Sequence, residues 1–264
     1  MTSPDGITWT LRSVPTESNW RSVTFANGLF VAVASSGGIG DRGMTSLDGI
    51  NWTAVSPSPF KGWKSVTYGN GLFVAVGGGI GSDDITTSPD GTTWTLRTLP
   101  VNVSWESITY GSGLFVAVAG IGSPNTVITS PDGINWTQRT SASSQAWIGA
   151  NITYGNNMFV AISTDSSGAK EVMTSPDGIT WTLQPSPMID HWDTMTYGNG
   201  MFVGIAYSST APASVILTSP DAITWTSTPP PPASPIGWTS ITYAIGKFVA
   251  VVNSGGSNRV MTSP

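Results

Sequence analysis

The sequence predicts an all-β protein, a six-bladed β-propeller of four-stranded antiparallel blades with the last blade closed by the N-terminal strand. One unit of about 43 residues recurs six times, and a fixed period of this kind identifies a repeat architecture. Each unit carries two hairpin signals, and the two chain ends supply complementary parts of one unit. A chain of 264 residues is long enough for one large all-β domain.

Two phrases define the repeat. The first is S-P-D-G-x-x-W-T, whose aspartates are Asp5, Asp48, Asp90, Asp132, Asp177 and Asp221. The second is W-x-S-I-T-Y-G-N-G-L-F-V-A-V, which begins at Trp20, Trp63, Trp105, Trp147, Trp192 and Trp238. The tryptophans of the two phrases account for all 12 in the chain, so no tryptophan is left over for a unique site.

Each unit divides into four expected strands, A to D. Strand A, W-x-S-I-T-Y, ends at an Asn-Gly pair such as Asn27-Gly28, which favours a tight hairpin to strand B. Strand B, L-F-V-A-V, is apolar on successive residues, which is typical of a strand covered on both faces. Strands C and D flank a Pro-Asp-Gly turn. Four antiparallel strands repeated around an axis give a propeller, in which neighbouring blades cover one another.

The chain ends predict how the ring closes. The chain begins with strands C and D and finishes with strands A, B and C, so we expect the last blade to take its outer strand from the N-terminus. The sequence M-T-S-P occurs at both ends, and we expect the C-terminal copy to occupy strand C while Met1–Pro4 is displaced. One domain, 1–264, is expected, with blades at approximately 15–57, 58–99, 100–141, 142–185, 186–228, and 229–264 plus 1–14.

Composition excludes several classes of function. Charged residues make up 9% of the chain, the net charge is −5 and no Lys/Arg cluster occurs, which argues against a nucleic-acid partner. No signal peptide is expected, because the N-terminus lacks a basic start followed by an apolar run. No membrane span is expected either, because no stretch approaches 18 uninterrupted apolar residues. With no cysteine there is no disulfide or thiolate site. The compartment stays open, with an extracellular or virion surface favoured, and we expect a monomer.

The phrase S-P-D-G-x-x-W resembles the Asp-box repeat of sialidases and related propellers, S-x-D-x-G-x-T-W. The resemblance covers the C–D hairpin of all six units, although Asp and Gly are adjacent here and Ala222 replaces the glycine in one unit. It implies a structural role for the six aspartates. A short carboxylate can indeed accept backbone N–H bonds within its own turn while the tryptophan packs beneath it.

The same resemblance implies a sialidase-like hydrolase as an alternative, with clustered arginines and a tyrosine nucleophile. Arg12, Arg97 and Arg139 instead follow the strand D tryptophan, and the tyrosines occupy repeat positions, so core or surface roles are expected for both. Glycoside hydrolysis also needs two carboxyl groups flanking a pocket. No pair stands out among the candidates Asp41, Asp83, Asp84, Glu106, Asp165, Glu171, Asp190 and Asp193.

Metal and cofactor sites are not expected. His191 is the only histidine, beside Asp190 and Asp193, and a single His without Cys or a second His is a weak metal signal. The pair Asp83-Asp84 lacks the spaced oxygen ligands of a calcium loop. We therefore predict no metal, no cofactor and no catalytic residue.

Binding is expected on the face that carries the B–C and D–A loops, because these differ between units whereas the A–B and C–D turns are nearly identical. The strand A tryptophans start at this face and would form a ring. They pack between blades, or they offer an aromatic platform for sugars, as a lectin-like site requires. The predicted ligand-binding residues are Trp20, Trp63, Trp105, Trp147, Trp192 and Trp238.

The sequence is therefore compatible with three functions. The first is a non-enzymatic, carbohydrate-binding module with repeated sites, in which multivalency turns weak sites into useful avidity. The second is a structural or protein-interaction propeller with a partner on the variable loops. The third is the sialidase-like hydrolase, with one asymmetric pocket.

Overall fold

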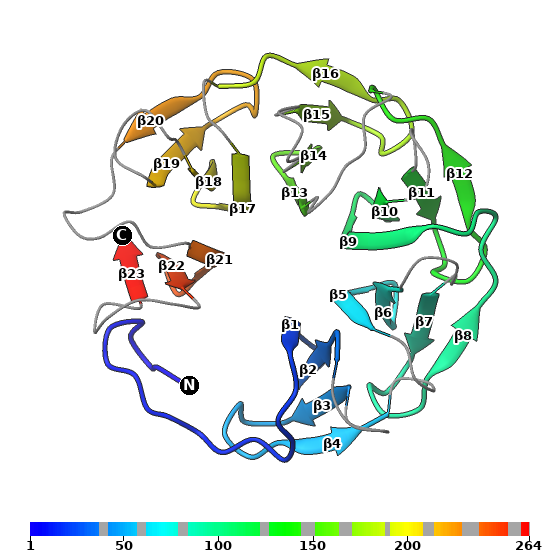
Figure 1. Ribbon diagram of the computed structural model, residues 1–264, viewed down its shortest axis with the longest axis vertical. Coiled ribbons are helices and arrows are strands. Elements are labelled where there is room, and N and C mark those ends of the chain that lie inside the picture. The colour runs from blue at the N-terminus through cyan, green and yellow to red at the C-terminus, as the bar shows by residue number, and fades with distance from the viewer. Residues whose placement is uncertain are drawn as a thin grey trace.

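The protein is a ring of six β-sheets, the blades, numbered one to six in chain order (Figure 1). The computed structural model describes residues 1–36, 42–56, 62–78, 84–121, 127–143, 151–163, 171–187, 191–207, 214–228, 238–252 and 260–263. The described residues form strands and turns but no helix. They therefore include no helix long and apolar enough to cross a membrane. The predicted all-β, six-bladed architecture is confirmed.

Each blade is an antiparallel meander whose strands follow the chain, with strand A of the repeat innermost in the ring (Figure 1). The first three blades are formed by β1 (Trp20–Ala26), β2 (Leu29–Ala34), β3 (Gly43–Ser46) and β4 (Thr53–Val55), by β5 (Trp63–Gly69), β6 (Leu72–Gly77), β7 (Asp84–Ser88) and β8 (Thr95–Arg97), and by β9 (Ser104–Gly111), β10 (Leu114–Ile121), β11 (Val127–Ser130) and β12 (Thr137–Arg139). The last three are formed by β13 (Asn151–Gly155), β14 (Met158–Ile162), β15 (Val172–Ser175) and β16 (Thr182–Gln184), by β17 (His191–Gly198), β18 (Met201–Tyr207), β19 (Ser214–Ser219) and β20 (Thr226–Thr228), and by β21 (Trp238–Ala244), β22 (Lys247–Val252) and β23 (Val260–Ser263).

Strand B carries the core of every blade. In β6 the side chains from Phe73 to Val76 are at most 1% exposed on both faces of the sheet. Such burial explains why this strand is apolar on successive residues, since each face is covered by a neighbouring blade. The core is therefore divided into clusters that lie between blades, as where Val31 and Val33 of blade one pack with Trp63 of blade two.

The C–D turn is held together by its own side chains. In blade three, Asp132 Oδ1 accepts hydrogen bonds of 2.8 Å from the backbone N–H groups of Ile134 and Asn135. The Trp136 indole N–H donates to Gly133 O at 3.1 Å, and Gly133 adopts a φ of 72°. The bond from the Asn135 N–H is the main reason that the pKa of Asp132 lies well below its usual value. The structural role expected for this aspartate is thus confirmed.

Two recurring contacts join neighbouring blades. The C–D turn packs on strand B of the preceding blade, so that a Cβ added at Gly91 would lie 2.7 Å from Leu29 and 2.9 Å from Val31. In addition, the backbone N–H of Val66 donates to Ser22 Oγ of the preceding blade at 3.2 Å. The same bond joins Ile108 to Ser65 at 3.3 Å and Ile152 to Ser107 at 3.2 Å.

The closure of the ring differs from the prediction. As expected, the C-terminal M-T-S segment occupies strand C as β23. Among the described residues, however, blade six has three strands, so the prediction of a fourth strand from the N-terminus was wrong. Thr2 and Thr10 pair with each other instead, through bonds of 2.9 and 2.8 Å. The identical C-terminal segment already fills the edge of β22, so the N-terminal hairpin keeps its own pairing and packs against blade six, where Lys247 Nζ donates to Asp5 O at 3.3 Å.

One A–B turn contains a strained residue and offers a stability test. Ile245 has a φ of 49° and is 69% exposed, whereas the corresponding residue of the second unit is Asn70. Positive φ is unfavourable for a β-branched side chain, and Asn tolerates it. We expect Ile245→Asn to raise the free energy of unfolding by about 1 kcal/mol. Urea unfolding measures this change, and an unchanged or lower stability would contradict the strain.

Candidate binding site at the channel mouth

Strand A contains a β-bulge directly after its tryptophan. In blade two, Trp63 pairs with Gly77 and Ser65 pairs with Val76, which leaves Lys64 without an opposite residue. Bulges re-aim a side chain and occur often beside functional sites. The same shift occurs in the five blades whose strand A is described from its tryptophan, and the residues at the bulge are Arg21, Lys64, Glu106, Asp193 and Thr239.

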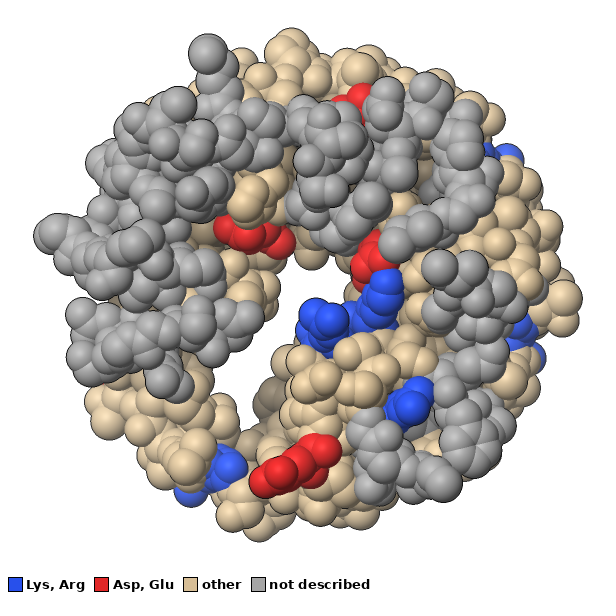
Figure 2. Space-filling view, viewed as in Figure 1, with Lys and Arg blue, Asp and Glu red and all other residues tan. Residues whose placement is uncertain are grey.

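These bulge residues differ in charge although the rest of strand A is similar between units. Arg21 and Lys64, in blades one and two, are basic, whereas Glu106 and Asp193, in blades three and five, are acidic. Only 9% of all residues are charged, whereas four of the five bulge residues are. Charge is therefore concentrated at this one position of the repeat. Because strand A is innermost, they lie at one mouth of the central channel, and Figure 2 shows acidic and basic groups meeting around the opening.

An ion pair links two blades at this mouth. Lys64 Nζ contacts Glu106 Oε1, and it also donates to Ser104 Oγ at 3.2 Å. The Lys64 and Glu106 side chains are 24% and 14% exposed, so they remain partly open to a ligand. Glu106 lies against Gly120, where an added Cβ would be 2.4 Å from Glu106 Cγ. Glycine at position 120 therefore leaves the space that the glutamate occupies.

The other two charges are held separately. Arg21 Nε donates to Ser35 Oγ at 3.1 Å. Asp193 Oδ1 lies 3.3 Å from His191 Nε2, and burial raises the pKa of Asp193 while His191 opposes that rise. The mouth therefore has a basic side on blade one and a partly desolvated acidic side on blade five. A ligand that carries both signs of charge would match this arrangement.

Of the five strand A tryptophans that the structure describes, three are inaccessible. Trp63, Trp105 and Trp192 are 0% exposed, and so these three rings cannot present a face to a sugar. Burial supports the packing alternative for them. Trp20 and Trp238 are half-buried, and for these two a platform stays a prediction. Trp147 lies outside the described residues.

Among the remaining candidates, Arg97, Arg139 and Glu171 have local partners. Arg97 Nε donates to Thr87 Oγ1 at 2.8 Å and Arg139 Nε to Thr129 Oγ1 at 3.0 Å, bonds that join strand D to strand C. Glu171 Oε1 accepts a bond of 2.7 Å from Ser143 Oγ, and Asp84 begins β7. Within the described ranges no group of three or more His, Cys, Asp or Glu could hold a metal ion. Asp41, Asp83, Asp165 and Asp190 lie outside those ranges.

Comparison with known proteins shows the fold. No family model matches the chain, and no curated protein matches it. Among solved structures it is similar to virginiamycin B lyase from Staphylococcus aureus, with a TM-score of 0.75 and 12% identity over 96% of this chain and 87% of that one. It is also similar to YCF48 bound to D1 peptide, with a TM-score of 0.66 and 17% identity over 95% and 79% of the two chains. A third is YjhT, with a TM-score of 0.65 and 10% identity over 96% and 99%.

The chain is thus a six-bladed β-propeller with a charged channel mouth. The similar structures include one enzyme and one protein bound to a peptide, at identities that establish the architecture alone. Function must therefore be argued from this chain's own side chains.

Proposed function

We propose that the protein is a non-enzymatic binding module that holds a polypeptide segment at the channel mouth. The observation that carries the proposal is the set of unit-specific charges on the strand A bulges, Arg21, Lys64, Glu106 and Asp193. Because the rest of strand A is similar between units, these charges make one asymmetric site here rather than several equal ones. A peptide with an acidic and a basic side chain can satisfy both sides of such a mouth, since charge complementarity fixes specificity and orientation.

The polypeptide ligand is preferred to a sugar for two reasons. The fully buried rings of Trp63, Trp105 and Trp192 remove half of the aromatic platform on which the carbohydrate proposal depends. The similar structure of YCF48 is a propeller bound to a peptide, which supports the idea that this architecture can present such a site. Sugar binding stays the second candidate, because Trp20 and Trp238 are only half-buried.

The proposal is tested by charge removal at the mouth. The full chain is applied to an array of random peptides, and the strongest peptide is titrated against the variants by calorimetry. Arg21→Gln should weaken binding about tenfold, which corresponds to about 1.4 kcal/mol, because it removes one charge-assisted contact. Asp193→Asn should also weaken binding. It should make the affinity less dependent on salt, because one fewer pair of charges between protein and peptide is left for salt to screen.

Arg139→Gln is the matched control. It removes one positive charge from the outer strand β12, and in blade four Gln184 already makes the equivalent bond to Thr174 Oγ1 at 2.7 Å. This variant should bind the peptide within twofold of the parent. Equal losses for Arg21→Gln and Arg139→Gln would reject the channel mouth as the site. Saturable binding on a glycan array, unaffected by Arg21→Gln, would transfer the proposal to the lectin-like function.

A further inference from the structure

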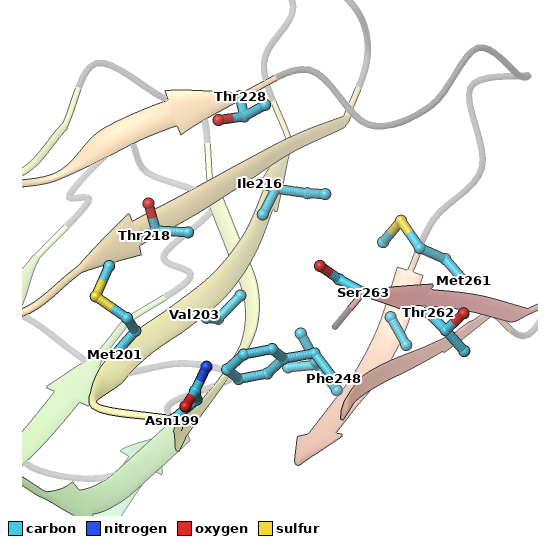
Figure 3. Close-up of a pocket in the computed structure, with 12 residues that line it drawn as sticks. Asn199, Met201, Val203, Ile216, Thr218, Thr228, Phe248, Met261, Thr262 and Ser263 are labelled. Atoms are coloured by element: carbon cyan, nitrogen blue, oxygen red, sulfur yellow. The ribbon is translucent and has the colours of Figure 1, made fainter. Parts of the chain in front are cut away.

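A cavity of about 600 Å³ opens between blades five and six (Figure 3). Met201 and Val203 of blade five face Phe248 and Met261 of blade six across it. Met201 and Val203 correspond in the repeat to Leu29 and Val31 of blade one. In blade one these positions are covered by the C–D turn of the next blade, at Gly91.

The same turn closes the junctions that follow. An added Cβ would lie 3.2 Å from Val74 at Gly133 and 2.9 Å from Val116 at Gly178. At the next junction Ala222, which is fully buried, packs with Val160 of blade four. The cavity between blades five and six is therefore shaped to receive one more C–D turn of the S-x-D-G-x-x-W type.

A second opening lies between blade six and blade one. Val23 of β1 is 59% exposed and Phe25 is 57% exposed. At the position of Val23, the other five blades have residues that are 4% to 9% exposed, because the preceding blade covers them: Val66, Ile108, Ile152, Met195 and Ile241. On the opposite side of the opening, Ser240 and Ala244 of β21 are exposed as well. Both faces therefore lack the inner strands that cover them elsewhere.

The outer part of this opening is already filled by the N-terminal hairpin. A Cβ added at Gly6 would lie 3.3 Å from Val249 and 3.6 Å from Thr262, the blade six counterparts of Val31 and Thr45. The hairpin thus sits where the C–D turn of a blade after blade six would sit. Gly49 of blade one gives matching evidence, since an added Cβ there would meet only Phe30 of its own blade and no preceding strand B.

We infer that the cavity and the opening together form a docking site for one further repeat unit of the S-x-D-G-x-x-W type. Such a unit would run from the Asp-Gly of a C–D turn through strand D to strands A and B. Its turn and strand D would fill the cavity and complete blade six. Its A–B hairpin would cover Val23 and Phe25 and would lie nearer to the ring axis than the N-terminal hairpin. One unit in this order accounts for the cavity, for the opening and for the lack of a preceding strand B beside Gly49.

The probe is a polypeptide with the sequence of residues 90–127, which contains these parts in this order. Titration into the full chain should give saturable binding with one site per chain. Val23→Glu, at the opening, and Met201→Lys, at the cavity, should each weaken binding at least tenfold, because each places a charge under an apolar cover. Ile179→Glu is the matched control, because Ile179 is 42% exposed on blade four, away from the cavity and the opening. This variant should bind the probe with an affinity within twofold of the parent.

A covalent fusion of the probe to the chain tests the same docking site if the free probe does not fold. The same sequence is joined after Pro264, and a scrambled sequence of equal composition is joined in a control chain. The intact unit should raise Tm by more than about 5 °C over the scrambled one, and Val23→Glu should remove the rise. Absence of both the binding and the Tm rise would overturn the inference. So would a dimer of the unextended chain that Val23→Glu dissociates, since a second copy would then cover the opening.

Discussion

Replacing Trp105 by alanine is expected to lower the free energy of unfolding by about 3–5 kcal/mol. The ring is 0% exposed and packs in one cluster with Val74 and Val76 of the preceding blade and Phe115 of its own. Its removal leaves a cavity at a blade junction, where both neighbours lose contacts. Urea unfolding followed by tryptophan fluorescence and circular dichroism measures the change.

Trp94→Ala is the comparison that isolates burial. Trp94 is only half-buried, and its indole N–H bonds to Gly91 O at 3.0 Å within the C–D turn. Its removal should cost less than the removal of Trp105, although both changes delete the same side chain. A loss below about 1 kcal/mol for Trp105→Ala would contradict the packing of strand A between blades.

Acid is expected to destabilise the protein steeply below about pH 4. The bonds from backbone N–H groups lower the folded-state pKa of all six C–D turn aspartates, to about 2 for Asp5. A lowered folded pKa contributes stability above the unfolded value of about 3.9, and this is lost as pH falls through the folded pKa. The free energy of unfolding should thus be level above about pH 5 and fall towards pH 2. Asp193, whose pKa is raised, acts in the opposite sense.

Urea midpoints at several pH values test this expectation. Asp132→Asn removes one of the six titrating groups, so it should lower stability at pH 6 and make the decline in acid shallower. Asp193→Asn is the control for a carboxyl outside the turns and should leave the acid decline in place. A stability that stays constant down to pH 2 would contradict the role of the turn carboxylates.

Much of the fold was predictable because the repeat makes it redundant. The Asn27-Gly28 turn, the apolar run of strand B and the Pro-Asp-Gly turn each signal a strand boundary, and six copies confirm one another. The position of the N-terminal hairpin was only partly predictable. The C-terminal M-T-S segment pairs with β22 as expected, but the pattern does not show that Thr10 pairs with Thr2 of its own hairpin rather than with β23.

The site was only partly predictable. Repeat spacing placed the strand A tryptophans at the variable face, but spacing does not report that Trp63 has no exposed surface. Sequence reasoning considered Glu106 and Asp193 only as scattered carboxylates and missed Arg21 and Lys64. The available signal was the residue after each strand A tryptophan, whose charge changes from unit to unit. The bulge that turns this residue into a rim position is a matter of strand register, which the sequence does not show.

Hydrogen exchange of four backbone amides tests the central claim, that blades stack face to face around a ring with one open junction. The N–H groups of Val66, Ile108 and Ile152 each donate to a serine hydroxyl of the preceding blade, whereas the equivalent Val23 faces the opening. Exchange at Val23 should therefore be much faster than at the other three. Equal protection of all four amides would mean that blade one is covered as the others are, and equal rapid exchange would mean that the blades do not stack.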